Sequence, residues 1–243
     1  MMQMPIASLT LLTLCLVAVP AGTQTPATPR SPSTVTLYSN GPVNGDTNAW
    51  TINNGFAVTD SIYIQSVQAQ ASVTTISFWA WLYGANCVTC PFTPDYVSSV
   101  QVQIGTTAFD NSKFDGVVTS WVASNCAVNA YAYELCQETA VFRGPTLNAG
   151  TVYWLTLQNA VASNGGVANT DPVYWDENSG VGCPSQGCPS SASENQIGTI
   201  PSESFTVGGY YTSALDPAAG AAPGKNPSGT PAPRPSALSS SGR

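Results

Sequence analysis

The sequence predicts an all-β protein, an antiparallel β-sandwich of jelly-roll type, and three observations carry this prediction. Charged residues make up only 8% of the 243 residues. Thr, Ser, Asn, Gly, Val and aromatic residues, which suit strands and turns, are abundant, whereas helix-favouring Leu, Glu, Lys and Arg are few. About ten short apolar or alternating segments are separated by turn residues, at the spacing expected of a sandwich.

The first predicted strands lie between turn-rich segments. Val35–Tyr38 opens the domain, and Phe56–Tyr63 follows a polar Asn-Asn-Gly turn. Val73–Tyr83 gives the longest strand signal in the sequence. One face of this strand carries Val73, Thr75, Ser77, Trp79 and Trp81, and the other carries Ile76, Phe78, Ala80 and Leu82. Large side chains on both faces indicate a central strand, or a strand with a ligand platform on its outer face.

Four further strands are predicted in the middle of the domain, over residues 97–104, 116–123, 130–135 and 139–142. The first of them alternates regularly, with Val and Ile side chains on the face that we expect to point inward.

Residues 151–158 alternate with the period of a strand, and the rest of the domain is organised around them. Tyr153, Leu155 and Leu157 share one face, while Val152 and Trp154 share the other. Because both faces begin with apolar side chains, we expect a central strand that is covered on both sides.

The last part of the domain alternates loops with short strands. A polar loop over residues 163–170 leads into a short aromatic strand, Val173–Trp175. Residues 181–196 are predicted to be a loop pinned by a disulfide, and Phe205–Val207 is the last strand.

Composition divides the chain into four parts. Residues 1–21 read as a secretory signal peptide, because their apolar run is too short to span a bilayer and ends in Val-Pro-Ala. Residues 22–34 form a flexible leader, residues 35–210 the sandwich domain, and residues 211–243 a disordered tail rich in Pro, Ala, Gly and Ser. We therefore expect a secreted, extracellular protein without a membrane span in the mature chain.

Six cysteines remain once the signal peptide is removed, and an even number in a secreted chain predicts disulfides. Six cysteines allow fifteen pairings. Their spacing favours three local pairs, Cys87 with Cys90, Cys126 with Cys136, and Cys183 with Cys188. The sequence has no His and no second Cys-x-x-Cys, which disfavours a zinc site.

The charge of the domain excludes some partners. Residues 35–210 contain twelve acidic side chains and two basic ones, Lys113 and Arg143, which gives a net charge of −10. Such a surface repels nucleic acid and anionic lipid.

Enzymatic activity is not expected. Without His, no Ser-His-Asp or Cys-His apparatus is available. A glycoside hydrolase needs only two carboxylates, which Asp176, Glu177, Glu194 and Glu203 could supply. The adjacent Asp176 and Glu177 point in opposite directions on a strand, so they do not flank one bond. This hydrolase remains the less favoured alternative.

A binding site is predicted where the aromatic strand ends. Trp175 lies beside Asp176, Glu177 and Asn178, a combination of aromatic surface with carboxylates and an amide that suits a sugar ligand. Calcium, held by oxygens of Asp171, Asp176, Glu177 or Asn178, is a second possibility, and no other cofactor is expected. The simpler interpretation is that aromatic residues such as Trp175 belong to the core.

Several segments together resemble one family. They are Leu37-Tyr-Ser-Asn-Gly-Pro42 with Asn48-Ala-Trp-Thr-Ile-Asn53, Phe56-Ala-Val-Thr-Asp-Ser61, Ser77-Phe-Trp-Ala-Trp-Leu82, Tyr153-Trp-Leu-Thr-Leu-Gln-Asn159, Pro172-Val-Tyr-Trp-Asp-Glu-Asn-Ser-Gly180, and Ser193-Glu-Asn195 with Ile200-Pro-Ser-Glu-Ser-Phe205. Over roughly residues 35–208 they resemble secreted bacterial β-sandwich proteins of the PEP-CTERM-associated type, common in exopolysaccharide-producing bacteria. The resemblance implies export and a sandwich fold, and carries no catalytic residues.

The sorting signal of that family combines Pro-Glu-Pro, an apolar helix and a basic cluster, none of which occurs in residues 214–243. We therefore expect free secretion. The leading functional hypothesis is interaction with extracellular polysaccharide or matrix, and the alternative is a purely structural surface or matrix protein without a small ligand.

Overall fold

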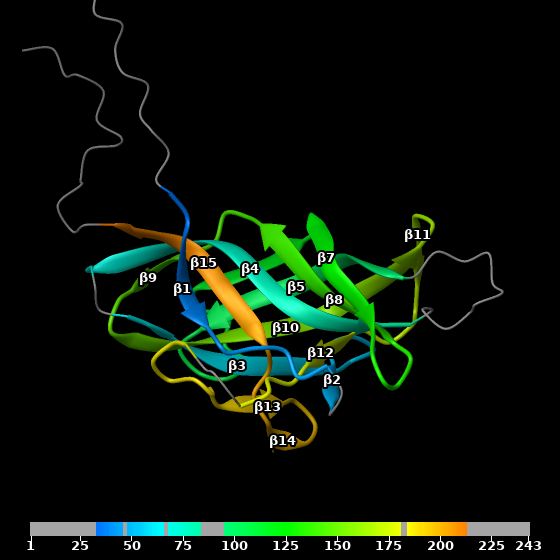
Figure 1. Ribbon diagram of the computed structural model, residues 1–243. Helices are drawn as coiled ribbons and strands as arrows, with labels where there is room; N and C mark the ends of the chain where they lie inside the picture. The colour runs from blue at the N-terminus through cyan, green and yellow to red at the C-terminus, as the bar shows by residue number, and fades with distance from the viewer. Residues whose placement is uncertain (1–32, 46–47, 66–67, 84–94, 181–183, 213–243) are drawn as a thin grey trace, which may run out of the picture. The chain divides into compact units, whose positions relative to one another are not determined.

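The computed structural model describes residues 33–45, 48–65, 68–83, 95–180 and 184–212, which contain fifteen strands in two sheets (Figure 1). The first sheet consists of β1 (Val35–Ser39), β2 (Ala49–Thr51), β4 (Gln70–Leu82), β7 (Trp121–Val128), β8 (Glu134–Val141), β9 (Thr146–Asn148), β12 (Tyr174–Asp176) and β15 (Phe205–Thr212). The second consists of β3 (Ala57–Ile64), β5 (Tyr96–Gly105), β6 (Phe114–Val118), β10 (Thr151–Asn164), β11 (Val167–Asn169), β13 (Ala192–Glu194) and β14 (Gly198–Ile200).

The two longest strands organise the two sheets. Along one edge β4 pairs with β15 and β12, and along its other edge with β8 and β9. In the second sheet β10 lies between β3 and β5. All these pairings are antiparallel, and the chain crosses repeatedly from one sheet to the other, so the predicted antiparallel sandwich is confirmed.

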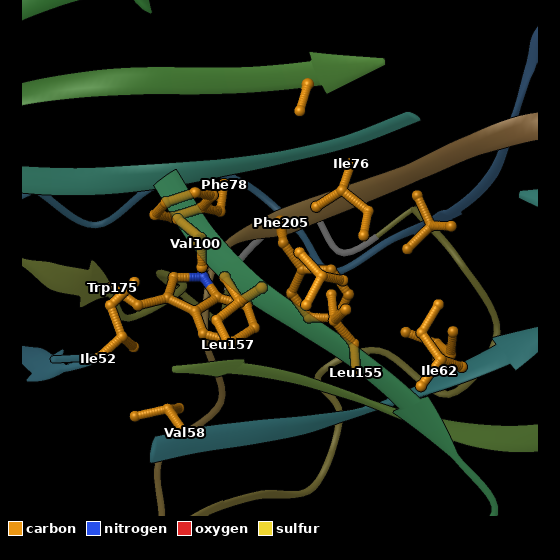
Figure 2. Packing of buried hydrophobic residues seen from close by; sticks show 14 of the residues in the cluster. Ile52, Val58, Ile62, Ile76, Phe78, Val100, Leu155, Leu157, Trp175 and Phe205 are labelled. Carbon is orange, nitrogen blue, oxygen red and sulfur yellow. The ribbon is translucent and has the colours of Figure 1, made fainter. Parts of the chain in front are cut away.

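The core fills the space between the sheets. From β10 the side chains of Tyr153, Leu155 and Leu157 point into it, so they share one face as predicted. Leu155 and Leu157 lie near Phe78 and Phe205, which come from the first sheet (Figure 2). At around 25 cal/mol per Å² of buried apolar surface, such a cluster supplies most of the driving force for folding. None of the described residues lies in a helix long and apolar enough to cross a membrane.

Two of the predicted strand faces differ in the structure. Opposite Gly208 and Gly209, the register of β4 skips Thr74, and this bulge turns Val73 into the core, away from the face that it was predicted to share with Trp79. On β10, Val152 is 49% exposed, so the start of this strand is covered on one side only.

Three boundaries also differ from the predictions. Residues 130–133 form a turn instead of a strand, and the strand predicted over residues 116–123 is divided between β6 and β7. The segment predicted as a loop over residues 181–196 includes β13, which pairs with β14 and with β3. The predicted signal peptide, most of the leader and most of the tail lie outside the described residues, as do Cys87, Cys90 and Cys183.

Candidate functional site: an aromatic pocket on the first sheet

The site begins where β4 and β12 run side by side. Tyr174 is the register partner of Trp81. The neighbouring residues Ala80 and Trp175 point into the core and are fully buried. Because side chains alternate along a strand, Trp81 and Tyr174 therefore lie together on the outer face of the sheet.

A tight turn adds two more rings to this face. Between β7 and β8, the Oδ1 atom of Asn129 accepts hydrogen bonds from the backbone N–H groups of Tyr131 and Tyr133 at 3.1 and 2.9 Å. The turn is closed by a bond from the Ala132 N–H to the Asn129 carbonyl, and Ala132 has a φ of 69°. Asn side chains form such turns readily, so this short segment holds both tyrosines in place.

A disulfide secures the hairpin that carries the turn. Cys126 and Cys136 are bonded, with their Cα atoms 4.2 Å apart, and they join β7 to β8. The prediction that these cysteines bracket a hairpin and pair with each other is confirmed. Closing so short a loop contributes about 2–3 kcal/mol in the chain-entropy account.

The rings form a continuous aromatic cluster. Tyr131 stacks on Trp81, with centroids 5.6 Å apart and planes inclined by 25°. Tyr133 lies 5.8 Å from Trp81, 5.6 Å from Tyr174 and 6.1 Å from Tyr83. Tyr83 and Tyr131 are each 57% exposed, so the cluster reaches the surface.

The cluster lines a pocket of about 310 Å³. Its walls are Asn48, Ala49, Trp81, Tyr131, Tyr133 and Tyr174. This volume is at the lower end of the range for small-molecule sites, which are usually apolar or aromatic with a few polar groups. The polar groups here are phenolic hydroxyls and the Asn48 amide, which suit a neutral, hydroxyl-rich ligand.

Burial and neighbouring groups set the electrostatics of the pocket. Desolvation, together with the adjacent Tyr133 hydroxyl, raises the pKa of Tyr174 to about 12. Desolvation also raises the pKa of Glu134 above its ordinary value. Tyr174 is therefore a neutral phenol at any physiological pH and can both donate and accept hydrogen bonds.

Asp176 does not line the pocket but holds the indole ring of Trp81, which does. The indole N–H of Trp81 donates to Asp176 Oδ1, and the backbone N–H groups of Asn44 and Gly45 donate to the same carboxyl. Asp176 is fully buried. Burial raises its pKa to about 6, although these donors pull in the opposite direction. This predicted ligand residue thus fixes the orientation of Trp81 and offers no free oxygen to a ligand.

Trp175, predicted as the ring that binds a sugar, is a core residue. Its side chain is fully buried, packs edge-to-face on Phe78 and Phe205, and donates its indole N–H to the Ser204 carbonyl at 3.1 Å (Figure 2). It has no free face for a ligand, so the simpler interpretation of this residue is the correct one.

The other two predicted binding residues are also engaged in structure. Glu177 is 6% exposed and accepts a hydrogen bond from the Trp50 indole at 3.0 Å. The Asn178 side chain donates to the Ser202 hydroxyl and accepts from the Gly180 N–H. Neither lines the aromatic pocket.

The predicted calcium ligands are not brought together. Asp176 is saturated with donors, as described above, whereas Asp171 lies next to Asp95, whose pKa burial raises. Two Asn side chains donate to Asp95 Oδ1. The four carboxyl groups considered for glycoside hydrolysis, those of Asp176, Glu177, Glu194 and Glu203, are 6% exposed or less.

Of the other four predicted disulfide cysteines, the described part of the chain includes one. Cys188 is in a disulfide, while Cys183, Cys87 and Cys90 lie outside the described residues. The pairings that involve them stay predictions.

No family model matches the sequence, and neither a curated protein nor a solved structure shows significant similarity to it. The resemblance to PEP-CTERM-associated proteins therefore also stays a prediction.

Sequence reasoning missed most of the pocket. It placed Trp81 on a candidate ligand face but assigned Tyr131 and Tyr133 to a strand and gave Tyr174 no role. One signal was available: Asn129-Ala-Tyr-Ala-Tyr133 begins with a turn-forming residue and follows a cysteine that was predicted to close a hairpin.

Proposed function

We propose that this protein is a secreted, non-catalytic binding module that holds an extracellular polysaccharide in the aromatic pocket of the first sheet. The observation that carries the proposal is the convergence of Trp81, Tyr131, Tyr133 and Tyr174 around one pocket, with Asn48 at its edge. Flat aromatic rings bury the apolar faces of sugar rings, while hydroxyl and amide groups meet their edges.

The charge of the domain favours a neutral glycan. The described part of the chain contains Lys113 and Arg143 as its basic residues, and neither lines the pocket. An anionic polymer would meet a surface of the same sign. A cation would find stacking partners but no carboxylate among the residues that line the pocket.

Binding is favoured over hydrolysis because no carboxyl group is among the residues that line the pocket. Glycoside cleavage needs two carboxyl groups that flank an accessible bond. Asp176, the carboxyl group that binds the Trp81 indole N–H, is buried and is held by N–H donors.

Tyr131→Ala tests the proposal most simply. This residue is 57% exposed, so its loss should change the melting temperature little while removing one face of the pocket. A base stacked on an aromatic ring is worth roughly 1–3 kcal/mol, and with a similar contribution from a sugar ring we expect a loss of affinity of about fivefold or more in electrophoresis through polysaccharide-containing gels.

Tyr96→Ala provides the matched control. Tyr96 is 40% exposed, lies on β5 of the other sheet and does not line the pocket. If both variants lost binding equally, or if Tyr131→Ala kept full affinity for a glycan that the wild type retains, the pocket would not be the binding site.

The structural alternative has one observation in its favour. Within the described residues β7 pairs only with β8, and Val122 and Val128 on it are 66% and 60% exposed. An uncharged, exposed edge strand is a template for pairing with another chain. Val122→Lys should then abolish self-association measured by sedimentation velocity without affecting glycan retention.

A further inference from the structure

Asp60 and Glu203 form a pair of fully buried carboxyl groups in the interior, away from the aromatic pocket. Asp60 alternates along β3 with the core residues Val58 and Ile62, so its side chain points between the sheets. Glu203 lies in the segment that joins β14 to β15. Its backbone N–H donates to Asp60 Oδ2 at 2.7 Å, which places the two residues side by side.

Three oxygen atoms of this pair make no hydrogen bond of ordinary geometry with the described residues, although the Ser190 hydroxyl lies close enough to Asp60 to lower its pKa. The three atoms are Asp60 Oδ1, Glu203 Oε1 and Glu203 Oε2. Leaving a buried polar atom without a hydrogen bond costs up to several kcal/mol of folding stability, so few such atoms remain in native proteins. A proton shared between the two carboxyl groups would satisfy two of these oxygens and would leave the third without a partner. The unpaired oxygens therefore point to a polar molecule or ion bound between them.

The surrounding charged groups indicate whether this bound group is a cation or an anion. The charged groups that act on Glu203 are Asp60, Glu177 and Asp176, all of them acidic. Four carboxyl groups in one region of low dielectric cannot all ionise without a positive counter-charge.

Neutral polar groups complete the surroundings. The Asn40 amide donates to Asp60 Oδ2 and to the Glu203 carbonyl at 3.3 and 2.6 Å. The Tyr38 hydroxyl donates to Asn40 Oδ1. Among the described residues, no three acidic side chains here bring one oxygen each within 4.8 Å of the others, so a cation at the pair would be held by two carboxylates and by carbonyl, amide or water oxygens.

We propose that Asp60 and Glu203 bind one calcium ion between the sheets. Calcium accepts six to eight oxygen ligands in flexible geometry and mixes carboxylates with neutral oxygens, whereas magnesium demands a nearly ideal octahedron. With only two carboxylates, the affinity belongs in the range of extracellular modules, about 10⁻⁴–10⁻³ M. The inference does not depend on the function proposed for the aromatic pocket.

The test is a thermal titration of the full oxidised chain with calcium chloride, against sodium chloride of equal ionic strength. Binding to the folded state alone should raise the melting temperature in proportion to the logarithm of the calcium concentration above the dissociation constant, by about 5–10 °C at a hundredfold excess over that constant. Calorimetry on the wild type should give one ion per chain.

Asp60→Asn and Glu203→Gln should each abolish the rise. Glu138→Gln, which changes another buried carboxyl on β8, should keep it in full. A melting temperature that rises no more in calcium chloride than in sodium chloride, a stoichiometry of zero, or the same rise in the Asp60→Asn/Glu203→Gln double variant would overturn the proposal. If the variants do not fold, the wild-type stoichiometry decides alone.

Discussion

The indole group of Trp81 makes two kinds of contact, a hydrogen bond through its N–H and aromatic packing through its ring. Its N–H is fixed by the buried Asp176 carboxyl, and its ring is covered by Tyr131 and Tyr133. Trp81 is 6% exposed, so a ligand would contact the edge of its ring and the faces of the tyrosines around it. This buried hydrogen bond thus fixes the ring on which Tyr131 and Tyr133 pack.

Trp175 has the opposite role, and the sequence could not distinguish the two tryptophans. Both lie on strands that carry further aromatic residues. Alternation separates the two faces of each strand, but it does not reveal which face of the sheet meets the other sheet, because this depends on pairings between residues far apart in the chain. β12 is three residues long, too short for its own pattern to identify the buried face.

Trp175→Ala should destabilise the protein by about 3–5 kcal/mol, because a fully buried ring is replaced by a cavity. Urea unfolding followed by circular dichroism measures the loss. Trp154→Ala, at a partly buried position on β10, should cost clearly less. A loss below about 1 kcal/mol for Trp175→Ala would place that ring outside the core.

At the scale of elements, the β7–β8 hairpin connects the fold to the pocket. It carries Tyr131 and Tyr133 at its turn and the Cys126–Cys136 disulfide between its strands. β7 is exposed along most of its length, so the hairpin has little apolar burial of its own and depends on these local restraints.

The double variant Cys126→Ser/Cys136→Ser should lose about 2–3 kcal/mol of unfolding free energy through greater chain entropy. It should also lose glycan affinity, because the turn is no longer restrained. Urea unfolding and gel retention measure the two effects. Retained affinity despite the lower stability would show that Asn129 alone is sufficient to position the tyrosines.

The elements also show where sequence prediction succeeds and where it ends. Long alternating segments such as β4 and β10 were recognisable, because one face of each is a row of large apolar side chains. β13 and β14 were missed, since three-residue strands with Ser, Gly and Thr have no periodicity and form only because β3 offers an edge. The aromatic pocket was missed for a similar reason: its residues come from four separate segments that only tertiary pairing brings together.

At the scale of the whole molecule, the sandwich buries several carboxyl groups in a domain that has few cations. Desolvation is the main cause that raises the pKa of Glu138 to about 7 and that of Asp60 to about 8. In the unfolded chain these groups titrate near their ordinary values. Because the folded state holds their protons more tightly, they make folding more favourable at acidic than at neutral pH.

Glu138 allows this effect to be measured. Its stabilising contribution is complete below a pH of about 4.5 and is lost as the pH rises through about 7. Glu138→Gln should therefore flatten the fall in unfolding free energy over this window, by up to about 3 kcal/mol. Unfolding is measured with a chelator present, so that no calcium binds at Asp60 and Glu203 in any of the variants.

Asp115→Asn is the control for this prediction. Asp115 is an exposed carboxyl whose pKa is lowered, chiefly by the Gln101 side chain, so its contribution appears at lower pH. It should leave the slope between pH 4.5 and 7 unchanged. An identical slope in the wild type and in Glu138→Gln would mean that Glu138 is ionised in the folded protein.

Fluorine NMR of the chain labelled with 5-fluorotryptophan tests the binding site most directly. Each of the six tryptophans gives its own resonance, which single Trp→Phe variants assign. On titration with a panel of neutral polysaccharides, one glycan should shift the Trp81 resonance saturably and leave that of Trp175 unchanged. A Trp81 resonance that stays fixed across the panel, or that stays fixed while another tryptophan moves, would contradict the assignment of the aromatic pocket as a polysaccharide site.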